Sequence, residues 1–150
     1  MLAAIVSLPL HRAPTKGLRM SGNFNKPRIL IADDNFVIRD LIKSFYEDYN
    51  FELIEAVNGM EAVEMARTCI FDLILLDIQL PFLNGYEVAA ILKHDKDVKD
   101  IPIVVITSHE HGEVEERING LYEGYVNKPF KKSHLMKATM KYLQRSIHKD

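Results

Sequence analysis

Five polar side chains suited to metal or phosphoryl chemistry follow closely on apolar runs of the sequence. They are Asp33, Asp34, Asp77, Thr107 and Lys128. Carboxylates are hard oxygen ligands of the kind that Mg²⁺ prefers, and a carboxylate can also act as a nucleophile. A hydroxyl and an ammonium group add hydrogen bonding and charge neutralisation for a phosphoryl group. If the apolar runs are strands of one parallel sheet, these side chains meet at one edge and predict a phosphoryl-transfer site.

An acidic pair at the end of a strand has a structural alternative, because such residues often cap the following helix. Asn35 stands directly before the expected start of a helix and can cap it alone or with help from Asp33 or Asp34. For this pair alone, capping and function are about equally supported. Asp77 directly follows the apolar run Leu73–Leu76, where a charge has no packing role, and it indicates function more strongly.

The elements that must position these groups alternate in type. After residue 27, short β-rich runs alternate with segments of helical period, which is typical of βαβ units and a parallel sheet. The predicted strands are Arg28–Ala32, Phe51–Ala56, Leu73–Leu76, Ile103–Ile106 and Tyr125–Val126. The first predicted helix is Phe36–Tyr49, with Ile38, Leu41, Ile42, Phe45 and Tyr49 on one face, and the second is Gly59–Cys69. Apolar residues at helical spacing mark the third helix, at Val88, Ile91 and Leu92, and the fourth, at Val114, Ile118 and Leu121. A closing helix runs through Leu135 and ends near Ile147.

The strand order follows from which runs are apolar throughout. Strands buried on both faces are unbroken apolar runs, as at Ile29, Leu73 and Ile103. Charges at Glu52 and Glu55 interrupt the second run, and the fifth is very short, so these two belong at the edges. Right-handed crossovers then favour a doubly wound α/β fold with the flavodoxin-like strand order 2-1-3-4-5. Ligands of such sheets bind beyond the carboxyl ends of the strands where the winding reverses, here between strands 1 and 3.

Composition limits the class of protein. A chain of 150 residues with 47% apolar and 27% charged residues is typical of one globular domain. The single Cys69 excludes an intramolecular disulfide and a cysteine-built zinc site. No run of about 18 apolar residues suggests a membrane span, and we expect a cytoplasmic protein. Residues 27–150 carry 15 basic and 21 acidic residues, a net charge of −6, so we expect no nucleic-acid partner and no membrane.

Residues 1–26 form a separate N-terminal extension with four basic residues and no acidic one. A secretory signal and an organelle transit peptide are both conceivable, but the first lacks a leading positive charge and the second is poor in serine. We favour a disordered extension, or translation that starts at Met20. The predicted functional domain is residues 27–150.

The same residues carry a resemblance to the response-regulator receiver domains of two-component signalling. It spans roughly residues 27–147 with normal spacing. The matching segments are Asp33-Asp34, Leu75-Leu76-Asp77-Ile78-Gln79-Leu80-Pro81, Asn84-Gly85-Tyr86-Glu87, Thr107-Ser108 and Lys128-Pro129-Phe130. Relatives usually have a Gly-Ala-Asp stretch before the fifth strand, whereas this chain has the bulkier Leu121 and Tyr122, which leaves the shape of that surface open.

The resemblance implies a role for each site residue. Asp77 would accept a phosphoryl group, Thr107 and Lys128 would contact the phosphoryl oxygens, and Ser108 would supply the small side chain beside them. Mg²⁺ would be held by Asp33 through water, by Asp34, by Asp77 and by the main-chain carbonyl of Gln79. Tyr125 would act as an aromatic switch coupled to Thr107, although a plain edge-strand aromatic is the alternative. The bond between Lys128 and Pro129 would be cis.

The resemblance also implies a signalling protein rather than an enzyme. The phosphoryl donor would be a sensor histidine kinase or a histidine phosphotransfer protein, and the output would be binding of a further protein through helix 4, strand 5 and helix 5. Because little sequence follows the last helix, we expect a stand-alone receiver; an intermediate in a phosphorelay is the alternative. An aspartate-nucleophile phosphatase would need an acid where Gln79 stands, and a flavin binder would need a glycine-rich loop after the first strand.

Overall fold

The computed structural model describes residues 26–147, and side chains as far as residue 144. The predicted N-terminal extension, apart from its last residue, lies outside the described residues. The elements in chain order are β1 (Arg28–Ala32), α3 (Phe36–Phe45), β2 (Glu52–Ala56), α4 (Gly59–Thr68), β3 (Leu73–Leu76), α5 (Gly85–Lys93), β4 (Ile103–Thr107), α6 (His111–Ile118), β5 (Gly124–Asn127) and α7 (Lys132–Ile147). Within this part of the chain, no helix is both long and apolar enough to cross a bilayer.

The five strands form one parallel sheet in the order β2-β1-β3-β4-β5, which confirms the predicted topology. Every residue of β3 and β4 is buried, whereas β2 exposes Glu52 and is only partly buried at its next three positions. The apolar runs therefore occupy the centre of the sheet because they are covered on both faces, and the charged strand lies at an edge.

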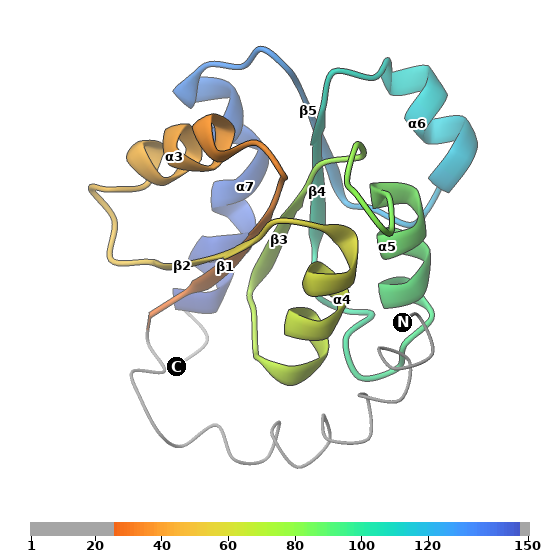
Figure 1. Ribbon diagram of the computed structural model, residues 1–150. Coiled ribbons are helices and arrows are strands. Elements are labelled where there is room, and N and C mark those ends of the chain that lie inside the picture. The colour runs from red at the N-terminus through yellow and green to blue at the C-terminus, as the bar shows by residue number, and fades with distance from the viewer. Residues whose placement is uncertain (1–25, 148–150) are drawn as a thin grey trace.

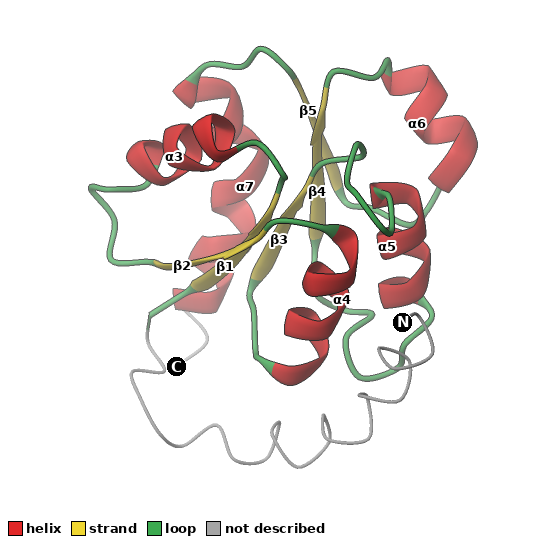
Figure 2. Cartoon of the chain, viewed as in Figure 1, coloured by secondary structure: helices red, strands yellow, loops and turns green. Residues whose placement is uncertain are grey.

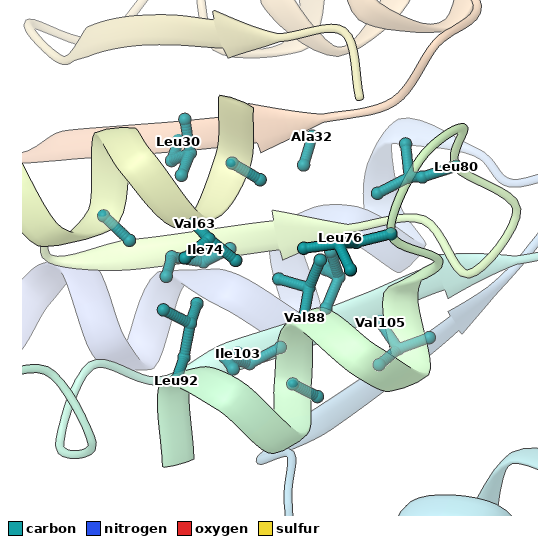
Figure 3. Packing of buried hydrophobic residues seen from close by; sticks show 14 of the residues in the cluster. Leu30, Ala32, Val63, Ile74, Leu76, Leu80, Val88, Leu92, Ile103 and Val105 are labelled. Carbon is teal, nitrogen blue, oxygen red and sulfur yellow. The ribbon is translucent and has the colours of Figure 1, made fainter. Parts of the chain in front are cut away.

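Helices cover both faces of the sheet (Figure 1). One hydrophobic core lies between the sheet and α4, α5 and α6; part of it is shown in Figure 3, where Leu30, Ile74 and Val105 of the sheet meet Val63 and Val88 of the helices. A second core lies on the other face, under α3 and α7. The loops that leave the carboxyl ends of β1, β3, β4 and β5 gather at one end of the sheet (Figure 2). That end holds the polar residues selected from the sequence.

The helix after β1 is shorter than predicted. It ends at Phe45, and both Leu41 and Tyr49 are exposed, so the predicted apolar face is wrong at these two positions. Tyr46 is buried instead, four residues after Ile42 on the same face, and its hydroxyl lies 2.7 Å from Thr139 Oγ1 of α7. A partner for the phenol makes burial of tyrosine favourable at this position.

Candidate functional site

Three carboxylates meet at the carboxyl ends of β1 and β3. Asp33 and Asp34 follow β1 and Asp77 follows β3, and because these strands are paired in register, the three residues come together. One oxygen from each lies within 4.8 Å of the others. Asp33 and Asp77 are 2% and 5% exposed, whereas Asp34 is open to solvent. The predicted cluster is therefore present, with two buried members and one exposed.

Capping does not account for this cluster. Asn35 is the N-cap of α3, and its side chain accepts hydrogen bonds from the main-chain N–H groups of Val37 and Ile38. Asp33 Oδ1 accepts from the N–H of Asn35, at 2.8 Å, and so bonds to the cap residue rather than to the first turn of the helix. Asp34 makes no side-chain hydrogen bond or ion pair with any residue of the described chain. The carboxylate of Asp34 is thus left available to a ligand.

Lys128 brings a positive charge into the cluster. Its Nζ lies 2.9 Å from Asp33 Oδ2 and 3.1 Å from Asp77 Oδ2, so the ammonium bridges the two buried carboxylates. The loop after β5 places it there: the Lys128 N–H donates to the main-chain carbonyl of Thr107. The peptide bond between Lys128 and Pro129 is cis, as predicted.

The crowding of like charges changes the protonation of the site. Burial raises the pKa of Asp77 above its ordinary value, and the charge of Asp33 raises it further, while Lys128 acts in the opposite direction. Burial by itself lowers the pKa of Lys128, but its bonds to Asp33 and Asp77 outweigh this, and the net direction is upward. The site therefore holds more negative charge than one ammonium fully compensates, which favours binding of a further cation.

The donor set fits Mg²⁺. This ion prefers oxygen ligands, usually one or two carboxylates completed by water and phosphate oxygens. Among residues 26–147, the Asp34 oxygens have no side-chain partner, and Asp77 Oδ1 accepts a long bond of 3.3 Å from the N–H of Gln79. Gln79 lies directly beside the cluster, although its predicted carbonyl contact with a metal stays a prediction.

Thr107 and Tyr125 are linked through the segment that follows β4. Thr107 is fully buried, and its Oγ1 accepts from the N–H of His109 at 3.3 Å; the neighbouring Ser108 is exposed. The hydroxyl of Tyr125 donates to the main-chain carbonyl of His109, and Asn127 Nδ2 lies 2.9 Å from the same hydroxyl. Tyr125 is thus tied to the residue that contacts Thr107, so a movement of one can reach the other.

A hollow of about 370 Å³ lies among the segments that follow β3 and β4 and residues of α5 and α6. It is lined by Ile78, Gln79, Leu80, Asn84, Tyr86, His109 and Arg117. The guanidinium of Arg117 lies 4.1 Å from the centre of the Tyr86 ring, and the Tyr86 hydroxyl lies 3.3 Å from His109 Nδ1. The bulky Tyr122 contacts Glu115 and His111 of α6 through its hydroxyl and so joins this helix to the loop that precedes β5.

One residue at the site was missed by the reading of the sequence. Arg39 of α3 donates from Nη1 to the main-chain carbonyl of Asp33 at 2.8 Å and from Nε to Glu55 Oε1 at 2.7 Å. In the sequence, Glu55 indicates only an edge strand. The available signal was an arginine one turn into the helix after the acidic pair, opposite an acidic residue on the neighbouring strand.

Comparison with known proteins gives consistent matches. The family model of the response regulator receiver domain matches residues 29–140. The polar-differentiation response regulator DivK of Brucella anthropi is 36% identical over 116 residues, which are 77% of this chain and 94% of that protein.

Solved structures agree with this result. The response regulator TrrA of Thermotoga maritima, in complex with Mg²⁺ and BeF, is 32% identical with a TM-score of 0.68, over 78% of this chain and 98% of that one. The receiver domain of the sensor histidine kinase PA1611 from Pseudomonas aeruginosa, with a magnesium ion in its active-site cleft, is 28% identical with a TM-score of 0.69, over 81% and 98% of the two chains.

Proposed function

The chain belongs to the response regulator receiver domain family, a phosphoacceptor of two-component signalling, and from that premise we propose that Asp77 is the residue that becomes phosphorylated. The observation that supports this choice most is the ammonium of Lys128, which bridges Asp77 and Asp33 beside the open carboxylate of Asp34. Asp33 and Asp77 both contact the lysine, and each lies within 4.8 Å of the other two acids. The choice of Asp77 between them follows from the family resemblance, in which the acid after the third strand is the phosphoacceptor.

The reaction is a transfer of a phosphoryl group from a phosphohistidine of a partner protein. A carboxylate oxygen of Asp77 attacks the phosphorus, the phosphorus–nitrogen bond breaks, and its electron pair stays on the imidazole, which takes up a proton from solvent. The product is an acyl phosphate on Asp77. Lys128 Nζ and Thr107 Oγ1 bind oxygens of the transferred group, and positioning and charge compensation account for most of the rate of such reactions.

Mg²⁺ is the cofactor that we propose for this site. Asp34 and Asp77 would hold it directly, with the main-chain carbonyl of Gln79, and Asp33 would act through water. Bound there, the ion supplies the positive charge that stabilises the oxygens of the transferred phosphoryl group. The support for this assignment is the set of three carboxylate oxygens within 4.8 Å and the fit of hard oxygen ligands to this ion.

The output of phosphorylation is a change of binding surface. Charge added at Asp77 would draw Thr107 toward the new phosphoryl oxygens and thereby act on Tyr125 through the segment at His109. The affected face comprises α6, β5 and α7. The partners that we propose are a sensor histidine kinase or histidine phosphotransfer protein as donor and a further protein as target.

A labelling experiment tests the assignment. The full chain is incubated with a small-molecule phosphodonor with and without Mg²⁺, and phosphoryl uptake is measured by intact mass. Wild type should take up one phosphoryl group only with Mg²⁺, and Asp77→Asn none. Asp48→Asn removes an exposed carboxylate away from the site and should behave as wild type. Equal uptake by the Asp77→Asn variant, or none by wild type, would overturn the proposal.

A further inference from the structure

The peptide unit that joins Asp33 to Asp34 is held by a side chain from outside the carboxylate cluster. Arg39 donates from Nη1 to the main-chain carbonyl of Asp33 at 2.8 Å. That carbonyl lies in the same rigid plane as the N–H of Asp34, so its orientation sets the direction in which the chain continues. The bond from Arg39 therefore acts on where the Asp34 side chain lies.

Asp34 depends on this support more than its neighbour does. Asp33 is fixed independently: its N–H donates to the carbonyl of Ala56, and its carboxylate accepts from Asn35 and Lys128. Asp34 is exposed, and its side chain bonds to nothing in the described part of the chain. The placement of its carboxylate thus comes from the backbone on which it stands.

Arg39 is itself oriented by Glu55 at the end of β2. Arg39 Nε lies 2.7 Å from Glu55 Oε1, and Lys43 Nζ lies 2.9 Å from Glu55 Oε2, so each oxygen of this carboxylate has one cation. The bond from Lys43, and then that from Arg39, hold the pKa of Glu55 below its ordinary value. Both side chains of the Arg39–Glu55 pair are partly buried. A planar guanidinium with two fixed directions of donation can serve Glu55 and Asp33 together.

We propose that Arg39, oriented by Glu55, is a positioning residue that holds Asp34 where it can ligate Mg²⁺. This inference rests on the magnesium site proposed above. It adds that residues of α3 and β2 hold one of the metal ligands in place. Partners of metal ligands in the outer shell typically change metal affinity by about 10–100-fold when they are removed. The charge of Arg39 acts in the opposite direction, since a cation near the site repels Mg²⁺. If Arg39 positions Asp34, removal of Arg39 should weaken Mg²⁺ binding. If Arg39 acts only through its charge, removal should strengthen Mg²⁺ binding.

The test is a titration of the full-length chain with Mg²⁺ alone, in which isothermal titration calorimetry measures the affinity for the ion. Arg39→Gln should bind Mg²⁺ roughly tenfold more weakly than wild type, although a positive charge has been removed. Lys43→Gln is the matched control, because it removes the other cation of Glu55 without a contact to Asp33. Its affinity should equal that of wild type or be slightly higher. Affinity of Arg39→Gln equal to or above that of wild type would overturn the proposal.

Two further variants keep the test decisive if Arg39→Gln does not fold, as judged by circular dichroism. Arg39→Lys keeps the positive charge but lacks the planar guanidinium, and Glu55→Gln keeps Arg39 but loosens its orientation. Both variants should bind Mg²⁺ more weakly than wild type. Wild-type affinity in both would refute the positioning role. Absence of Mg²⁺ binding by wild type would instead refute the proposed function itself. Normal binding by wild type and by all Arg39 and Glu55 variants would refute only the positioning role.

Discussion

Replacement of Lys128 by methionine should destabilise the metal-free protein, because it leaves two buried carboxylates without their shared counter-charge. Asp33 and Asp77 lie 2.9 Å and 3.1 Å from the ammonium, and their side chains are 3% and 5% exposed. Removal of one partner of a buried ion pair costs about 3–5 kcal/mol. The lysine side chain is 19% exposed, so solvent screens part of its charge, and the lower end of this energy range applies. We expect a loss of about 3 kcal/mol, which lowers Tm by roughly 10 °C.

The assay is urea unfolding at neutral pH without Mg²⁺, followed by circular dichroism. Lys132→Met is the control: its ammonium lies 3.8 Å from Asp48 in an exposed pair, so its loss should change the unfolding free energy by less than about 0.5 kcal/mol. Addition of Asp77→Asn to the Lys128→Met variant removes one of the two carboxylates and should restore most of the lost stability. A loss below about 1 kcal/mol, or no recovery in the double variant, would refute the electrostatic reasoning.

Three further predictions concern the same part of the molecule. Because the folded pKa of Asp77 is raised, the stability of wild type relative to Asp77→Asn should fall as pH rises above 3.8, the ordinary pKa of aspartate. Asp77→Asn should therefore be the more stable protein at neutral pH without Mg²⁺. Urea unfolding of both proteins across pH measures this difference, and parallel curves would contradict its sign. Gly85→Ala should destabilise by about 1–3 kcal/mol, since a Cβ there would lie 2.4 Å from the main-chain oxygen of Asp77. A thermal melt identical to that of wild type would contradict this clash. Tyr46→Phe should lower the free energy of unfolding by about 0.5–1.5 kcal/mol, because the hydrogen bond to Thr139 is lost. An unchanged midpoint of urea unfolding would show that this hydrogen bond does not stabilise the protein.

The architecture could be predicted from the sequence because burial and strand position are coupled. The runs at Ile29, Leu73 and Ile103 are apolar at every position, so only central places in a sheet covered on both faces suit them. Once strand order is known, residues that directly follow neighbouring parallel strands must lie close together. The meeting of Asp33 and Asp77 needed no knowledge of side-chain conformation.

The details that were missed depend on how far individual side chains reach. Arg39 was not recognised because a guanidinium on a helix can face solvent or turn back to the preceding loop, and only the position of Glu55 on the adjacent strand decides between these. The end of α3 was placed too late because Tyr49 continues the apolar pattern. Its ring stacks on Phe51 outside the helix, a contact that helical periodicity does not report.

Chemical mapping of the phosphorylated residue tests the central claim most directly. Borohydride reduces an acyl phosphate to the alcohol, which converts a phosphorylated aspartate to homoserine. The chain is treated with a phosphodonor and Mg²⁺, reduced and digested, and the position of homoserine is read by tandem mass spectrometry. We predict homoserine at position 77 and unmodified aspartate at positions 33 and 34. Homoserine at position 33 or 34, or at none of the three, would contradict the account.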